Sequence, residues 1–292
     1  MLSGCASSDG KKLVVFCNPK IYISHDEGIS WNETPDKSFF QNIDGTIQLS
    51  CSDTAEVVAV VSQNGYVWVS KDFGQSWNIT SAPVKGYISI AMSSNGSTIG
   101  VNDYWGDRDT GGVFISKDFG VTFPMSSDVE TYSRHAKLLI SSDGLTILSF
   151  VYWNGIMVSV DGGVTFKSIS GYSGGNYGSI DATVSSSDCS VVYFTSGGTS
   201  NVFRSMDTGL NWSTPPTNIG ARDWQVLVSS SSGLKVAGFV RNEGVYVSGD
   251  YGDSWVKDLD LPLNTGQLLL ASDDFRVVFA FTDGSIYRRK YF

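Results

Sequence analysis

Several residue types and patterns are scarce in this chain of 292 residues. Positive charge is one of them, because 20 lysines and arginines stand against 29 aspartates and glutamates and leave a net charge of −9. A chain this acidic is repelled by nucleic acid and by anionic membrane surfaces, so we expect neither as a partner. No apolar run approaches the roughly 20 residues that span a bilayer, so we expect no membrane insertion. No segment has a convincing helical period or the layout of a signal peptide.

Histidine and cysteine are also rare. The two histidines, His25 and His135, stand alone, without the spacing of metal ligands. The four cysteines, which also lack metal spacing, are Cys5, Cys17, Cys51 and Cys189. We therefore expect no metal and no cofactor. The first three cysteines fall in apolar runs that predict core strands, where a free thiol packs as a small hydrophobic group. The sequence leaves open whether a disulfide joins any of them.

What the chain does contain is an eight-residue motif, Ser-x-Asp-x-Gly-x-(Ser/Thr/Asn)-(Trp/Phe). Its six copies occupy residues 24–31, 70–77, 116–123, 159–166, 205–212 and 248–255. Their aspartates are Asp26, Asp72, Asp118, Asp161, Asp207 and Asp250, which follow one another at intervals of 43 or 46 residues. That interval suits one four-stranded blade of a β-propeller.

The residues of the motif suggest a local structural role. An Asp carboxylate can accept hydrogen bonds from the backbone amides of its own turn. The Gly suits a positive φ angle, which a Cβ atom would oppose. The closing Trp or Phe is long enough to wedge between neighbouring sheets. We therefore assign the six aspartates a structural role and exclude them as catalytic residues.

The segments around the motif predict an all-β fold, a seven-bladed β-propeller that forms one domain over residues 1–292. Apolar runs separated by Gly, Ser, Asp and Asn read as strands and turns. The expected blades span about 1–46, 47–87, 88–135, 136–180, 181–224, 225–265 and 266–292. The last has no motif copy and no fourth strand, so we expect an incomplete blade of three strands or a chain that is a fragment of something longer.

The six copies resemble the Asp-box, or BNR repeat, of sialidases, xyloglucan hydrolases, sortilin-type receptors and photosystem II assembly factors. In that superfamily the box closes a hairpin on a propeller blade and indicates architecture rather than activity. The resemblance implies an extracellular or extracytoplasmic location. It also implies that ligands lie among the loops that join strand two to strand three, and each blade to the next, on the face away from the boxes.

Aromatic and charged residues gather in those loops. The candidate ligand-binding residues are Tyr104, Trp105, Asp107, Arg108, Tyr152, Trp153, Arg222, Asp223, Trp224, Arg241 and Glu243. Exposed aromatic planes beside polar groups suit the stacking of sugar rings. They would suit a protein partner almost as well, because Trp, Tyr and Arg are common anchors of interfaces. The alternative is that the aromatics plug the channel mouth and pack against neighbouring loops.

We interpret the chain as a non-catalytic recognition module, with a glycan favoured over a protein partner as its ligand. One alternative is a glycoside hydrolase of sialidase-like or xyloglucanase-like type. Arg134, Arg222 and Arg241 could then cluster, with Glu243 close to Arg241. The pair of carboxylates that a hydrolase needs could come from Asp103, Asp107, Asp109, Asp223 and Glu243. The Phe/Tyr-Arg-Ile-Pro motif of sialidases is absent, however, and xyloglucan hydrolases pair two propellers around a cleft. A further alternative is a scaffold like the photosystem II assembly factors, whose basic patch has little counterpart here.

Overall fold

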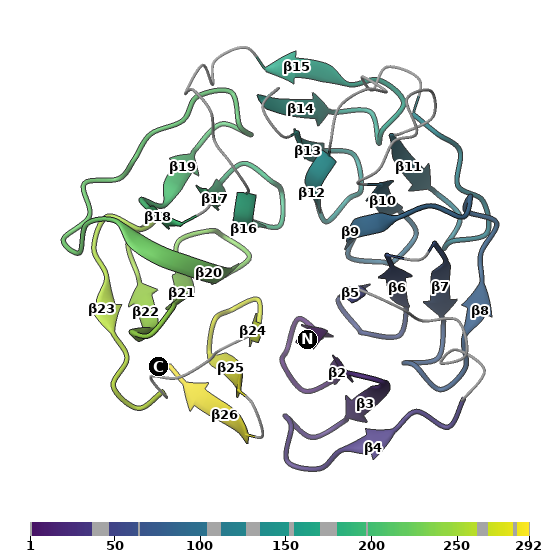
Figure 1. The fold of residues 1–292 in the computed structure, drawn as a ribbon, viewed down its shortest axis with the longest axis horizontal. Coiled ribbons are helices and arrows are strands. Elements are labelled where there is room, and N and C mark those ends of the chain that lie inside the picture. The colour runs from purple at the N-terminus through teal and green to yellow at the C-terminus, as the bar shows by residue number, and fades with distance from the viewer. Residues whose placement is uncertain are drawn as a thin grey trace. The chain divides into compact units, whose positions relative to one another are not determined.

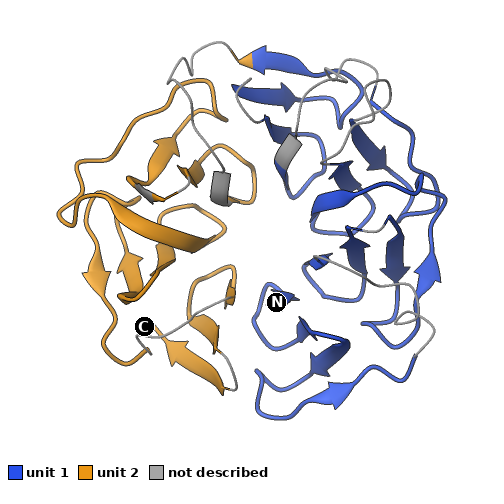
Figure 2. Cartoon of the chain, viewed as in Figure 1, with its two compact units in different colours: residues 1–168 blue, residues 169–292 orange. Residues whose placement is uncertain are grey.

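The computed structural model describes residues 2–36, 47–63, 65–103, 112–126, 135–151, 155–169, 180–196, 198–261, 268–282 and 285–291. Their regular elements are all β-strands, and the fold is the seven-bladed β-propeller that the repeat predicts, with three strands in the last blade (Figure 1). Within the described residues no helix is long and apolar enough to cross a membrane. The chain divides into two compact units, Met1–Ser168 and Ile169–Phe292 (Figure 2).

The first unit contains four antiparallel sheets. Sheet one consists of β1 (Leu2–Ala6), β2 (Leu13–Cys17), β3 (Lys20–Ser24) and β4 (Asn32–Glu33). Sheet two consists of β5 (Ile47–Cys51), β6 (Val58–Ser62), β7 (Val67–Ser70) and β8 (Asn78–Ile79). Sheet three consists of β9 (Tyr87–Met92), β10 (Ile99–Asp103) and β11 (Val113–Ser116), and its outermost pairing is a single bridge between Phe114 and Met125. Sheet four consists of β12 (His135–Ile140), β13 (Ile147–Val151), β14 (Gly155–Ser159) and β15 (Lys167–Ile169).

The second unit contains sheets five to seven. Sheet five consists of β16 (Ile180–Ser185), β17 (Val192–Ser196) and β19 (Phe203–Ser205). Sheet six consists of β20 (Arg222–Ser229), β21 (Val236–Val240), β22 (Gly244–Ser248) and β23 (Val256–Lys257), and β18 (Thr199–Ser200) adds to its β20 edge. Sheet seven consists of β24 (Leu268–Ala271), β25 (Val277–Thr282) and β26 (Ser285–Lys290).

The closing aromatics of the motif fill the space between neighbouring sheets, as predicted. Trp77 belongs to one buried cluster with Val14 and Ile23 of sheet one and Val58 of sheet two. Three further closing aromatics each belong to a buried cluster that contains residues of two successive sheets: Phe123, Phe166 and Trp255. The remaining two, Trp31 and Trp212, are half-buried and belong to the first sheet of each unit. The core of each unit is therefore built up sheet by sheet.

The eight-residue motif has the turn geometry expected from its residues. In the second copy Asp72 Oδ1 accepts hydrogen bonds from Ser76 N (2.9 Å) and Ser70 Oγ (2.7 Å), while Oδ2 accepts from Ser76 Oγ (2.5 Å). Gly74 has a φ angle of 79°, and its N–H donates to Ser70 Oγ (2.7 Å). Equivalent bonds occur in the other five copies. The six aspartates are thus occupied within their own turns.

These bonds hold the motif aspartates in their charged form. The hydroxyl and backbone donors of Ser30 lower the pKa of Asp26 to about 2, and those of Thr122 do the same for Asp118. The pKa of Asp161 is lowered still further, by Thr165. The pKa values of the aspartates in the other three copies are lowered as well, because hydrogen bonds to the carboxylate outweigh the opposing effect of burial.

A second repeat, which the sequence analysis did not identify, joins the first and second strands of every sheet. We call it the Ser turn, and its seven serines are Ser7, Ser52, Ser93, Ser141, Ser186, Ser230 and Ser272. Each serine Oγ accepts a hydrogen bond from the backbone N–H five residues later, at 2.9–3.1 Å. The third residue after each serine has a positive φ angle, even where it is Ala55, Cys189 or Phe275. The backbone N–H of Phe73, in the second motif copy, donates to Glu56 O in the Ser turn of the same sheet (2.9 Å). The motif turn and the Ser turn of a sheet therefore lie on the same face.

Backbone hydrogen bonds also connect successive Ser turns. In the first unit Ser8 N donates to Asp53 O (2.8 Å), Asp53 N to Ser94 O (2.8 Å) and Ser94 N to Ser142 O (3.0 Å). In the second unit a corresponding series runs from Ser187 through Ser231 to Asp273, at 2.8 Å for each bond. The sheets of each unit are therefore linked edge to edge by a ladder of peptide groups, in addition to their buried side chains.

The structure contains a disulfide, a possibility that the sequence left open, and corrects the expectation for one cysteine. Cys5 of β1 and Cys51 of β5 form a disulfide that joins the first strands of sheets one and two, with their Cα atoms 5.9 Å apart. Cys17 is exposed at the end of β2, so it is not the core residue that its apolar run predicted. Cys189 is buried in a Ser turn, outside the disulfide.

Candidate functional site

The best-defined group of candidate residues lies in sheet six, where β20 begins and where β21 turns into β22. These segments are on the face expected to bind ligands, since the motif and Ser turns leave sheet six at the other ends of its strands. The turn is tight, with Arg241 N donating to Asp223 O (2.9 Å) and Glu243 N to Val240 O (3.1 Å). Strand β18 pairs with Arg222 and Asp223 and fixes their backbone from the other side.

Two ion pairs connect these segments, and together with Gln225 they form what we call the sheet-six charge cluster. Arg222 Nε lies 3.1 Å from Glu243 Oε2, and Arg241 Nε lies 3.4 Å from Asp223 Oδ2. Gln225 bridges the second pair, donating to Asp223 Oδ1 (2.6 Å) and accepting from Arg241 Nη2 (2.7 Å). The four charged side chains are between 30% and 61% exposed. Ion pairs this accessible typically contribute only about 0–1 kcal/mol to folding, so the cluster adds little to the stability of the fold.

A buried aromatic layer supports the charge cluster from below. Tyr246 Oη donates to Glu243 Oε2 (2.8 Å), and its ring lies edge-on to that of Trp224, with centroids 6.1 Å apart. Trp224 in turn packs against Trp255, the closing aromatic of the sixth motif copy, at 4.8 Å. Burial, followed by the bond to Glu243, raises the pKa of the Tyr246 phenol. The carboxylate of Glu243 is therefore held by a neutral donor on one side and a guanidinium on the other.

The structure corrects the role expected for Trp224. Its side chain is only 1% exposed and belongs to the core between sheets five and six, so it cannot serve as a stacking platform. An added Cβ on Gly238 of β21 would lie 2.4 Å from the indole, which shows how closely the ring fits. Trp224 lies within β20 rather than in a loop, and the β-bulge between Trp224 and Val226 sets which side chains of this strand face inward.

Four of the eleven predicted ligand-binding residues are brought together: Arg222, Asp223, Arg241 and Glu243. The pairing differs in detail from the expectation, because Glu243 pairs with Arg222 rather than with Arg241. Six predictions fall outside the described residues: Tyr104, Trp105, Asp107, Arg108, Tyr152 and Trp153. Arg134 and Asp109 fall outside them as well. Gln225 and Tyr246 were not predicted as residues of the site, because the sequence marks each of them only as a polar group within an apolar run.

The described carboxylates near this face are engaged in structural contacts. Asp103, a candidate for the catalytic pair, is 1% exposed at the end of β10, where it accepts a bond from Gly112 N (3.1 Å) and lies 3.7 Å from Lys85 Nζ. Asp223 and Glu243 are held by arginines, as described above. Within the part of the chain that the structure describes, no three His, Cys, Asp or Glu side chains are grouped so that they could hold a metal ion.

Comparison with known proteins yields matches among solved structures only, because no family model and no curated protein matches the chain. An ancestral GH74 enzyme superimposes with a TM-score of 0.75 and 16% identity, covering 99% of this chain and 44% of the enzyme. The GH74 xyloglucanase from Xanthomonas campestris does so with a TM-score of 0.73 and 12% identity, covering 99% and 51%. YCF48 bound to D1 peptide gives a TM-score of 0.70 and 13% identity, covering 99% and 91%.

What is shared is the propeller fold. Identities of 12–16% carry no information on activity, since one fold supports many unrelated functions. The coverage does differ between the two groups. This chain spans about half the length of the two GH74 enzymes and nearly the whole length of YCF48.

Proposed function

We propose that this protein is a non-catalytic recognition module that binds a polypeptide segment with charged side chains. Binding takes place on the face opposite the eight-residue motifs. The observation that carries the proposal is the sheet-six charge cluster, in which two arginines and two carboxylates are held half-exposed above a buried aromatic layer. Charged groups that are accessible and already held in position are available to a partner.

The chemistry of the cluster suits a polypeptide ligand. Each guanidinium has five N–H donors, so Arg222 and Arg241 retain donors for carboxylates or carbonyl oxygens of a partner while they stay paired within the cluster. Asp223 and Glu243 offer acceptor oxygens to lysine or arginine side chains. Gln225 and Tyr246 hold the charged groups in place before binding, which reduces the entropy that association costs.

A further observation supports this reading. YCF48, whose fold and length are similar, is a propeller that binds a peptide, whereas the GH74 enzymes are about twice as long.

We also propose that the eight-residue motifs are Asp-boxes and that the protein works in an extracellular or extracytoplasmic compartment. The Cys5–Cys51 disulfide supports that location, because structural disulfides are rare in the reducing cytosol.

A glycan remains the alternative ligand, and a glycosidase the alternative activity. The burial of Trp224 removes one of the three tryptophans expected to stack on sugar, which weakens the glycan reading. Of the carboxylates suggested for a hydrolase, Asp223 and Glu243 are held in ion pairs with arginines and Asp103 is buried, which weakens the glycosidase reading. We therefore place both behind recognition of a polypeptide.

The test is a binding screen on two arrays, one of peptides with mixed charge and one of sialylated and plant cell-wall oligosaccharides. Wild-type protein is compared with the double variant Arg222→Ala/Arg241→Ala. The matched control is Arg276→Ala, which removes an exposed arginine that pairs with Asp274 (3.2 Å) in a Ser turn on the other face. Circular dichroism confirms the fold of each variant.

We expect charged peptides to bind wild type and the control with equal affinity, and the double variant at least about tenfold more weakly, which corresponds to about 1.4 kcal/mol. Binding of oligosaccharides alone would favour the glycan alternative, and their cleavage would overturn the non-catalytic assignment. Peptide binding that survives in the double variant would show that the site lies elsewhere.

A further inference from the structure

The motif side of the first unit contains a series of contacts between successive motif copies. The second residue of one copy faces the fourth residue of the next. His25 lies against the ring of Phe73, with centroids 4.6 Å apart, and Lys71 Nζ lies 5.7 Å from the centroid of Phe119. At these two junctions an aromatic ring of the chain itself is therefore covered by a basic or imidazole side chain.

The third junction has the covering residue but no ring. Here Lys117 faces Gly162, and a Cβ atom added to Gly162 would lie 2.9 Å from Lys117 Nζ. Lys117 Nζ instead donates to Asp161 O (3.3 Å), beside the glycine. The fourth motif copy thus has no side chain at the position that Phe73 and Phe119 occupy in the second and third copies, and the movable end of Lys117 lies there instead.

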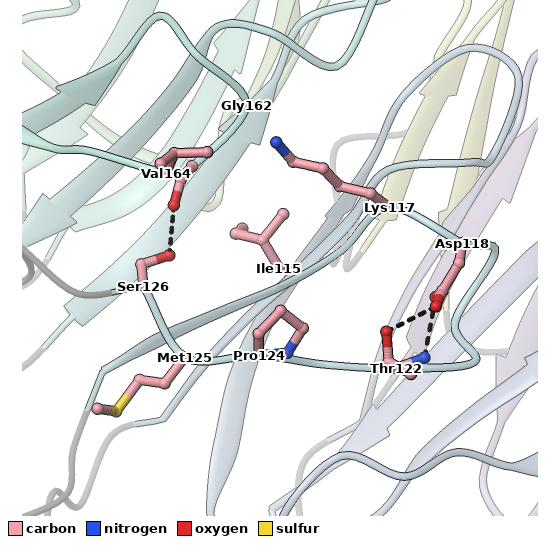
Figure 3. A pocket seen from close by; sticks show the side chains of 10 residues that line it. Ile115, Lys117, Asp118, Thr122, Pro124, Met125, Ser126, Gly162 and Val164 are labelled. Carbon is pink, nitrogen blue, oxygen red and sulfur yellow. Dashed lines mark hydrogen bonds between the residues drawn. The ribbon is translucent and has the colours of Figure 1, made fainter.

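A groove of about 370 Å³ opens at this junction, entirely within the first unit (Figure 3). Ile115 lies between Lys117 and Pro124, and Val164 lines the opposite wall next to Ser126. Met125 and Val164 are 47% and 56% exposed, so both apolar side chains are accessible to a ligand in the groove. Two sets of hydrogen bonds hold the walls in place. Ser126 Oγ donates to Gly163 O (2.8 Å), and Thr122 N and Oγ1 donate to the carboxylate of Asp118.

We propose that this groove binds an aromatic side chain presented by a partner polypeptide. The bound ring would take the place that Phe73 and Phe119 occupy at the two preceding junctions, with the Lys117 ammonium over its face. A cation over a ring is attractive, and the thioether of Met125 offers a second favourable contact with an aromatic edge. A volume of about 370 Å³ accepts a phenol or indole ring together with its connecting atoms.

This site is independent of the function proposed above. It lies at the motif turns, and none of its residues belongs to the sheet-six charge cluster. The sequence analysis set these turns aside as purely structural, so a ligand there would give the motif side of the protein a second role. The two proposals can fail separately, because their variants share no residue.

The first test uses the full-length protein and methyl-labelled NMR spectra, with N-acetyl-tyrosinamide and N-acetyl-leucinamide as probes. We expect the tyrosine probe to shift the methyl signals of Ile115, Met125 and Val164, and the leucine probe to bind more weakly. Lys117→Gln is expected to weaken binding of the tyrosine probe about fivefold and to leave the leucine probe unaffected. Absence of shifts at these methyl groups, or equal affinity for both probes, would overturn the proposal.

The second test fills the groove with a ring from the protein itself. Gly162→Phe recreates the sequence of the second and third copies, in which Phe73 and Phe119 adopt φ angles of 59° and 60°, close to the 71° of Gly162. The nearest atom to the new Cβ is the flexible end of Lys117, so the fold should accept the change. The matched control is Thr208→Phe, at the same motif position in sheet five (φ 59°). We expect Gly162→Phe to abolish binding and Thr208→Phe to preserve it; undiminished binding by folded Gly162→Phe would refute the assignment.

Discussion

The Cys5–Cys51 disulfide gives a quantitative prediction for stability. It joins the first strands of two successive sheets across a sequence separation of 46 residues. Closing a loop of this length in the unfolded chain removes conformational entropy worth about 4 kcal/mol at 25 °C. We therefore expect Cys5→Ala/Cys51→Ala to lower the free energy of unfolding by about 2–4 kcal/mol, with the upper value reached if the native sheets keep their positions.

Urea unfolding followed by circular dichroism and tryptophan fluorescence measures the change. The dependence of the free energy on urea concentration should stay the same or rise slightly, because the unfolded chain without the crosslink is less compact and exposes more surface. Cys17→Ala, which removes an exposed free thiol, is the control and should have little effect. Titration of thiols in denaturant should detect two groups without reductant and four with it. Four groups without reductant, or a loss of stability below about 1 kcal/mol, would refute the reasoning.

Two further predictions concern the eight-residue motif. Since the pKa values of Asp26 and Asp118 are about 2 in the folded protein and about 3.9 in an unfolded chain, their contribution to stability is complete above pH 4 and lost as the pH falls toward 2. The melting temperature should therefore fall steadily from pH 4 to pH 2, and an unchanged value over this window would contradict the assignment. Trp77→Ala should cost about 3–5 kcal/mol in urea unfolding because the indole is buried between two sheets. Trp31→Ala should cost less than half as much, since this copy is half-buried; equal losses would show that the closing aromatics do not act as wedges.

The fold could be predicted because its main signal is local and repeated. Each motif copy determines its own turn, because Asp72 or its equivalent accepts hydrogen bonds from residues within four positions. The pattern can therefore be read without knowing the tertiary structure. The Ser turn is equally regular in the structure, but it was not predicted from the sequence. Its third position varies from Asp9 to Thr54, Asn95 and Ser232, and only the bonds of the serine hydroxyl reveal that the turns are equivalent.

The candidate site could be predicted only in part, because it depends on where side chains point. Sequence correctly placed the charged residues at one end of sheet six. It could not foresee that Trp224 turns inward, since that depends on a β-bulge in β20 and on space left by Gly238 in the neighbouring strand. The partners of Arg222 and Arg241 are likewise set by the tight turn between β21 and β22 rather than by proximity in sequence.

The ladder between Ser turns has a consequence for how such a protein can evolve. Because it is built from peptide groups, mutation of Ser8, Asp53 or Ser94 can change the side chain without removing the bond. A blade copied by gene duplication would meet the same donor on one neighbour and the same acceptor on the other, whatever residues its turn has acquired. Substitutions in these turns should therefore have little effect on stability, whereas the closing aromatics must continue to fit the particular sheets between which they lie.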